Sequence, residues 1–183
     1  MKTALLIIAL SFCVIGCDRP EQTVASSDTK TLYGKRIVAT YEAMAIWADG
    51  GDRVKLLLDD KTKPYCRLES IDCPETASKN FRAQPFSFHA QAYANTLCVG
   101  KTVTVHKTGT DSSGRPLVFL IADGTNVNAA LIAEGWAWHY NDDPELAAIK
   151  AEARKAKRGL WAREDAVEPW MWQKQQGARK VKQ

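Results

Sequence analysis

Five short segments with alternating apolar residues, separated by turns rich in glycine, aspartate and proline, limit the possible folds of this chain most strongly. In the clearest of them, residues 52–58, the side chains of Val54, Leu56 and Leu58 share one face of a predicted strand. An Asp-Gly-Gly-Asp turn joins this strand to one predicted over 36–47, so the two are expected to form a hairpin. The remaining strands are expected over 64–71, 101–107 and 116–122.

Helical spacing of apolar residues predicts three helices, over 86–97, 127–133 and 144–158. The first of these lies between the third and fourth predicted strands. The expected fold is therefore α+β and mainly β: a five-stranded OB-fold barrel with about three covering helices, a type of barrel on which nucleic acids often bind. One domain over 36–163 is long enough to bury a core.

Acidic and basic residues recur around these strands in a pattern that suggests phosphate chemistry. Asp52 ends the first turn, and Asp72 and Glu75 follow the third predicted strand, which carries Arg67. Arg115 comes later, after a glycine. Carboxylates supply oxygen ligands for a metal ion, and guanidinium groups bind phosphate through paired hydrogen bonds. This combination predicts an enzyme that cleaves phosphodiester bonds.

Several short motifs, in the same order, resemble those of the thermonuclease or staphylococcal-nuclease-like family, and the resemblance covers about residues 36–163. The matching segments are Asp49-Gly50-Gly51-Asp52, Arg67-Leu68, Ile71-Asp72-Cys73-Pro74-Glu75, Gln84-Pro85-Phe86, Gly100-Lys101-Thr102-Val103, Asp111-Ser112-Ser113-Gly114-Arg115, Asp123-Gly124 with Val127-Asn128, Glu134-Gly135-Trp136-Ala137-Trp138-His139-Tyr140, and Arg158-Gly159-Leu160-Trp161.

The resemblance implies a calcium-dependent nuclease that cleaves DNA and RNA and leaves 3′-phosphates, and we expect it to act as a monomer. It also implies a role for each matching site residue. The implied calcium ligands are Asp52, Asp72 and the backbone carbonyl of Cys73; Glu75 would position or deprotonate the attacking water, Arg67 and Arg115 would bind the scissile phosphate, and Tyr140 would lie near the substrate.

Three positions depart from the family pattern. Gly51 is an extra residue in the first turn, Arg53 stands where the family has threonine, and Ser113 replaces a tyrosine before the Gly-Arg pair. These differences leave open a non-catalytic OB-fold module that binds single-stranded nucleic acid, or a structural protein of the cell envelope. The intact set of acids and arginines favours the nuclease.

The N-terminus has the pattern of a secretion signal over residues 1–16, with Lys2 before a short apolar run. The sequence Val-Ile-Gly-Cys that ends at Cys17 resembles a bacterial lipobox, which implies cleavage before Cys17 and lipidation of its side chain. Residues 17–35 would then form a polar, flexible tether. We expect the domain in the periplasm or cell envelope, anchored to the membrane by lipid; an ordinary signal peptide and a secreted protein are the alternative.

The last part of the chain, residues 164–183, is expected to form a basic tail. Such a tail would either attract phosphate or be a solvated, disordered end, and runs of charge favour the second interpretation. The formal net charge of +4 neither requires nor excludes nucleic acid. The basic residues of the tail are Lys174, Arg179, Lys180 and Lys182.

Three cysteines remain in the predicted domain, Cys66, Cys73 and Cys98. Outside the cytosol they would allow one disulfide and one free thiol, and the spacing does not assign the pair. The cysteines and histidines do not have the spacing of a zinc site.

Overall fold

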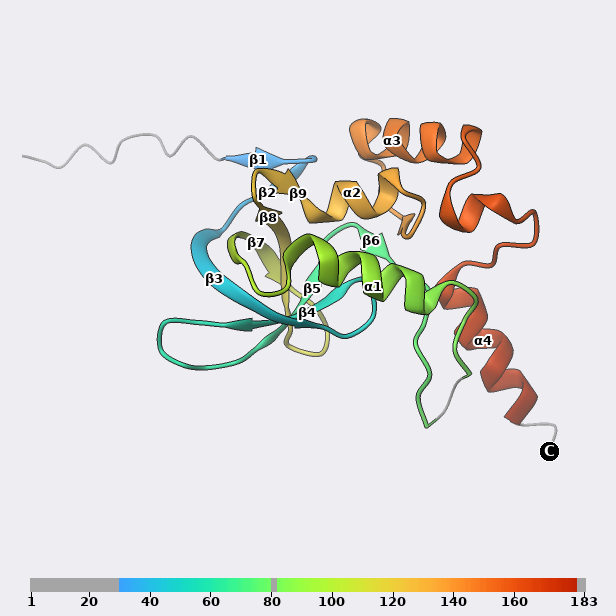
Figure 1. The fold of residues 1–183 in the computed structure, drawn as a ribbon, viewed down its shortest axis with the longest axis horizontal. Helices are drawn as coiled ribbons and strands as arrows, with labels where there is room; N and C mark the ends of the chain where they lie inside the picture. The colour runs from blue at the N-terminus through green and yellow to red at the C-terminus, as the bar shows by residue number, and fades with distance from the viewer. Residues whose placement is uncertain (1–29, 80–81, 181–183) are drawn as a thin grey trace, which may run out of the picture.

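A closed β-barrel forms the centre of the molecule (Figure 1). The computed structural model describes residues 30–79 and 82–180. The barrel strands are β3 (Ala39–Ala48), β4 (Arg53–Leu57), β5 (Tyr65–Leu68), β7 (Thr102–Thr110) and β8 (Pro116–Ala122). They pair antiparallel in the order β5-β4-β3-β7-β8, and the parallel pair of β5 with β8 closes the barrel. This order is that of an OB-fold and confirms the expected fold.

The barrel interior is formed by every second side chain along its strands, because successive side chains of a strand point to opposite faces. Alternate side chains of β4, β5, β7 and β8 are almost fully buried, and full burial of one such side chain contributes about 1.5–3 kcal/mol. These interior residues include Val54, Leu56, Cys66, Leu68, Val103, Val105, Val118 and Leu120.

The described residues form four α-helices around and beside the barrel: α1 (Ser87–Cys98), α2 (Val127–Ala133), α3 (Pro144–Lys155) and α4 (Pro169–Lys180), with a 3₁₀ turn, η1 (Gly159–Ala162), between the last two. Figure 1 shows α1 crossing the barrel, α2 and α3 in successive layers on one side, and α4 at the C-terminal end of the molecule. Side-chain caps begin two of them: Asn126 accepts from Ala129 at the start of α2, and Asp143 accepts from Leu146 at the start of α3.

Three short pairings connect the barrel to its surroundings. β1 (Thr31–Leu32) and β2 (Lys35–Arg36) form a small hairpin, and β9 (Thr125–Asn126) pairs with the end of β8. β6 (Ile71–Asp72) pairs antiparallel with β10 (Trp138–His139), which brings the segment after β5 against the chain that precedes α3.

Two expectations at the ends of the domain were wrong. Residues 169–180, expected as a disordered basic tail, form α4, in which Trp170 packs on Trp138, Trp172 donates to the Arg82 carbonyl and Gln173 donates to Glu75. Residues 31–36, assigned to the tether and the first strand, form the β1–β2 hairpin, in which Tyr33 packs on the buried ring of Phe119 with centroids 5.4 Å apart. The signal peptide, Cys17 and most of the tether lie outside the described residues.

Among the described residues, no helix has the length and apolar content needed to cross a membrane. Cys66, Cys73 and Cys98 are all buried free thiols, so neither a disulfide nor its pairing is seen.

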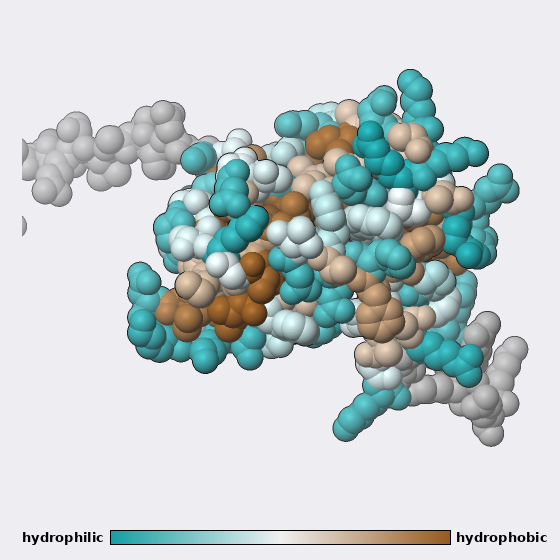
Figure 2. All heavy atoms as spheres, in the orientation of Figure 1, coloured by the Kyte–Doolittle hydropathy of each residue, from teal (hydrophilic) through white to brown (hydrophobic). Residues whose placement is uncertain are grey.

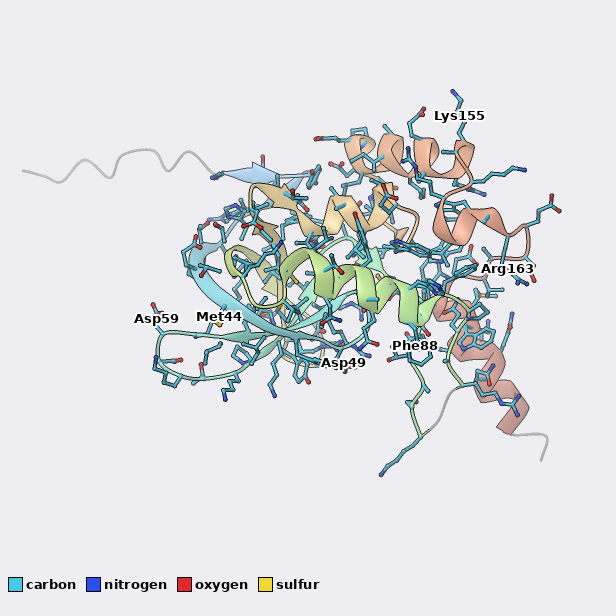
Figure 3. All side chains as sticks on the ribbon, viewed as in Figure 1. Met44, Asp49, Asp59, Phe88, Lys155 and Arg163 are labelled. Carbon is cyan, nitrogen blue, oxygen red and sulfur yellow. The ribbon has the colours of Figure 1, made fainter. Side chains whose placement is uncertain are left out.

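The face shown in Figure 2 has an apolar patch at the open end of the β3–β4 hairpin, near the labels of Met44 and Asp59 in Figure 3. Met44 is 44 % exposed there and pairs in register with Leu57. The other end of the hairpin carries Asp49 and packs near the start of α1. The candidate site residues gather at this second end.

Candidate active site

Asp52, Asp72 and Arg67 form a compact, largely buried charge cluster. Asp52 lies immediately before β4 and is only 6 % exposed; its carbonyl accepts a hydrogen bond from Leu68 at 2.8 Å, which fixes it beside β5. One guanidinium nitrogen of Arg67, Nη2, lies 2.5 Å from Asp72 Oδ1 and 3.1 Å from Asp52 Oδ2. The structure therefore brings two predicted calcium ligands and one predicted phosphate ligand into direct contact.

The two carboxylates carry more negative charge than the single facing guanidinium compensates. Burial raises the pKa of Asp72, the Asp52 carboxylate raises it further, and Arg67 opposes the rise. Burial alone would lower the pKa of Arg67, but the two aspartates outweigh it and raise that pKa above its ordinary value. A site with this balance favours the binding of an additional cation.

Cys73, whose backbone carbonyl is the third predicted calcium ligand, lies in the hydrophobic core beside the cluster. Its side chain is buried, and burial raises the pKa of the thiol well above the ordinary value. A side chain at the extra residue, Gly51, would place its Cβ 2.5 Å from the Cys73 sulfur and 3.0 Å from Ala90 Cβ. The insertion therefore fits only as glycine, and it packs the turn directly against the predicted ligand.

The donor set fits calcium, because all its predicted protein ligands are oxygens. Within residues 30–79 and 82–180, no group of three or more His, Cys, Asp or Glu side chains is placed to hold a metal. Calcium usually takes about six to eight oxygen ligands. Asp52, Asp72 and the Cys73 carbonyl would thus supply part of its shell, with water and substrate phosphate supplying the rest.

Glu75 lies on the irregular segment between β6 and α1, and its position is fixed at both the backbone and the side chain. Its N–H donates to Oε1 of Gln84 at 3.1 Å, and its carbonyl accepts from the Gln84 N–H at 2.8 Å. One carboxylate oxygen, Oε1, accepts a hydrogen bond from Nε2 of Gln173 on α4. The candidate general base is therefore held by residues before α1 and by a helix near the C-terminus.

Arg115 lies in the turn between β7 and β8 and is held by its own turn. Its Nε donates to Asp111 Oδ2 at 2.7 Å, and Asp111 Oδ1 accepts from the backbone of Ser113 and Arg115 at 2.8 and 2.9 Å. Its ion pair is thus with Asp111, whereas Arg67 pairs with the two site aspartates. Arg67 lies on β5, and Arg115 directly precedes β8, which pairs with β5 at Arg67 and Leu117.

Tyr140 follows β10 and lies beside the charge cluster through the β6–β10 pairing, in which Trp138 is the partner of Asp72. Its side chain is 48 % exposed. Partial burial and the Glu69 carboxylate raise the pKa of Tyr140 while Arg67 opposes them, which indicates that the phenol lies within electrostatic range of the site. A half-exposed phenol in this position is available to a substrate.

Arg53, the second departure from the family pattern, is engaged at the edge of the cluster. Its Nε donates to the Asp49 carbonyl at 3.0 Å, and its Nη2 donates to Thr76 Oγ1 at 3.2 Å and lies 3.7 Å from the Asp49 carboxylate. The added charge is therefore partly neutralised by Asp49. Arg53 links the β3–β4 turn to the segment that carries Glu75.

Three supporting residues were not assigned a role from the sequence: Asp111, Gln84 and Gln173. The motifs that contain Asp111 and Gln84 were recognised, but only the folded structure shows what their side chains bind. Gln173 lies in the segment expected to be disordered, and the proline that begins α4, Pro169, was the available sequence signal for a helix.

Taken with the OB-fold, this cluster defines a class of protein: a barrel equipped to bind and hydrolyse a phosphodiester. The sequence comparisons agree. Residues 65–163 match the family described as "Staphylococcal nuclease homologue". The chain is 38 % identical over 126 residues to a protein named "Uncharacterized endonuclease" from Escherichia coli O157:H7, an alignment that covers 67 % of this chain and 78 % of that protein.

It is also 30 % identical over 138 residues to a micrococcal nuclease from Shigella flexneri, covering 68 % of this chain and 75 % of that protein. The chain belongs to the staphylococcal nuclease family. It is accordingly a nuclease, an enzyme that hydrolyses phosphodiester bonds.

Proposed function

We propose that this nuclease requires calcium, cleaves both DNA and RNA, and leaves 3′-phosphate ends. The observation that carries the proposal is the buried pair of Asp52 and Asp72 at Arg67, with Glu75 three residues further along the chain. Bound at these carboxylates, calcium would supply positive charge that polarises the phosphate and offsets the charge of the transition state.

The two arginines would bind the scissile phosphate. Arg67 uses Nη2 for both aspartates, and its remaining N–H groups are geometrically separate donors for phosphate oxygens. Arg115, held by Asp111, would donate from the other side of the β5–β8 junction. Such donors stabilise the extra negative charge that builds on the phosphate during attack.

Glu75 would accept a proton from the attacking water. The water oxygen then forms a bond to phosphorus while the bond from phosphorus to the 5′ oxygen breaks, and that oxygen leaves with a proton. The products are a 3′-phosphate and a 5′-hydroxyl. The hydrogen bond from Gln173 goes to Oε1 of Glu75, and we assign the task to Oε2.

The test is cleavage of single-stranded DNA, double-stranded DNA and RNA by the full chain, with calcium and with a chelator. We expect activity only with calcium, 3′-phosphate ends, and a kcat for Glu75→Gln lower by about 10²–10⁴-fold, the usual contribution of a general base. The matched control is Glu164→Gln, at an exposed position outside the cluster, which should leave kcat unchanged.

Activity that persists in the chelator would refute the calcium requirement. Equal activity of wild type and Glu75→Gln would remove Glu75 from the reaction, and 5′-phosphate ends would show that the other phosphorus–oxygen bond breaks.

We also propose that the enzyme works outside the cytosol as a monomer, attached to the envelope through lipid on Cys17. The lipobox-like sequence supports this location. Nucleic acid substrates there would reach the site without passing the inner membrane.

A further inference from the structure

The segment after residue 163 lies beyond the part of the chain that matches the family, yet it returns to the candidate active site. Three hydrogen bonds attach it to the segment that carries Glu75. Gln84 Nε2 donates to the Val167 carbonyl at 2.6 Å, Trp172 Nε1 donates to the Arg82 carbonyl at 3.1 Å, and Gln173 Nε2 donates to Glu75 Oε1.

Gln84 transmits this attachment to the backbone of Glu75. Its side chain is buried, with the residue only 4 % exposed, and its amide uses one end for Glu75 N–H and the other for the Val167 carbonyl. The same C-terminal segment thus supports the Glu75 backbone through Gln84 and contacts the Glu75 carboxylate through Gln173.

Aromatic contacts between α4 and the domain hold the helix in the position in which Trp172 and Gln173 make their hydrogen bonds. Trp170 packs edge-on to the buried ring of Trp138, with centroids 6.4 Å apart, and Trp138 packs on Trp161 at 4.5 Å. Pro169 is buried at the start of the helix. The first residues of α4 therefore pack against the domain, and Gln173, in the next turn of the helix, contacts Glu75.

We propose that Gln173 is a positioning residue for Glu75, and that α4, which follows the matched residues 65–163, orders the candidate general base. A glutamate on irregular backbone has three side-chain torsions to fix, and a hydrogen bond to Oε1 selects the rotamer that presents Oε2 to water. An amide suits this role because it donates without introducing a full positive charge. The proposal rests on the proposed role of Glu75.

The kinetic test uses the full chain with DNA and saturating calcium. Gln173→Ala should lower kcat by about 2- to 10-fold, the effect of losing one exposed hydrogen bond, with KM unchanged. Gln173→Glu should lower kcat further, because two carboxylates would then face each other. Gln175→Ala, an exposed position on the same helix, is the matched control and should match wild type.

A double-mutant cycle separates positioning from general stability. In a Glu75→Gln background, Gln173→Ala should have no additional effect on kcat, because its action passes through the missing carboxylate. Additive losses would overturn the proposal, and so would a rise in kcat for Gln173→Ala, which would mean that the hydrogen bond blocks the base.

A spectroscopic test does not depend on activity. The side-chain amide resonance of Gln173 should shift in Glu75→Gln, while that of Gln175 should not. If the wild type does not cleave but this shift is seen, the proposed function fails and the contact stands. If the wild type cleaves through Glu75 and the shift is absent, the positioning role fails by itself.

Discussion

At the scale of single residues, Arg67 has two roles: it pairs with the site aspartates, and it is proposed to bind the substrate phosphate. It compensates part of the negative charge of Asp52 and Asp72 in the absence of a metal, and it is proposed to bind phosphate when a metal is present. Because a cation bound by the aspartates would take over part of the charge compensation, the two functions of Arg67 are linked.

This linkage predicts opposite effects of Arg67→Gln on binding and on catalysis. Calcium should bind more tightly, because a competing positive charge is gone, and the increase in unfolding temperature on adding calcium should be larger than in wild type. The kcat for DNA should fall by about 10²–10³-fold, the cost of losing a preorganised donor to the transition state. Calorimetric titration and steady-state kinetics measure the two effects.

Arg53→Gln is the matched control, since Arg53 pairs with Asp49 rather than with the site aspartates. Weaker calcium binding in Arg67→Gln than in the control would place the cation away from Asp52 and Asp72.

At the scale of secondary-structure elements, one buried amide connects α2 to the barrel closure. Asn128 is fully buried; its Oδ1 accepts from Leu120 N–H at 3.2 Å, and its Nδ2 donates to the carbonyls of Glu69 and Val118 at 3.0 and 3.1 Å. These are the residues where β8 meets the end of β5, the strand that carries Arg67.

Asn128→Ala should therefore lower the free energy of unfolding by about 2–4 kcal/mol, because it leaves buried backbone groups without a partner. Urea denaturation measures the change. A loss below about 1 kcal/mol would show that the backbone rearranges to satisfy these groups without the amide.

The elements that the sequence predicted best are those bounded by local signals. The strand expected over 116–122 and the helix expected over 127–133 have the observed bounds, because the Asp-Gly turn at 123–124 separates them and Asn126 caps the helix. The β6–β10 pairing was not predicted, since two-residue strands so far apart in the chain have no local pattern. For the same reason α4, which depends on contacts with Trp138 and Arg82, was mistaken for a tail.

The candidate site likewise has residues that local motifs identified and a contact that the sequence did not reveal. The motifs identified Arg67, Asp72 and Glu75 as chemical groups, because the residue types and their spacing resemble the family. They did not reveal that Gln173 contacts Glu75, because that contact depends on tertiary structure and on a helix outside the matched region.

At the scale of the whole molecule, the described domain supplies catalysis and the N-terminal sequence is proposed to supply location. The proposed attachment is through lipid on Cys17, the last residue of the lipobox-like sequence. Each buried methylene of an acyl chain contributes about 0.8 kcal/mol to membrane binding. One chain then gives only marginal, reversible binding, so more than one chain is needed for stable anchoring.

Expressed with its own signal in a Gram-negative host, the wild type should incorporate a labelled fatty acid and sediment with membranes. Cys17→Ser should lose the label and move to the soluble or secreted fraction, because it has no thiol to acylate, while the specific activity of the folded domain should be unchanged. Cys13→Ser, outside the lipobox-like sequence, is the matched control and should behave as wild type. A Cys17→Ser protein that still sediments with membranes would show that the enzyme is held there by some contact other than lipid on Cys17, and an unlabelled, soluble wild type would identify the first sixteen residues as an ordinary signal peptide.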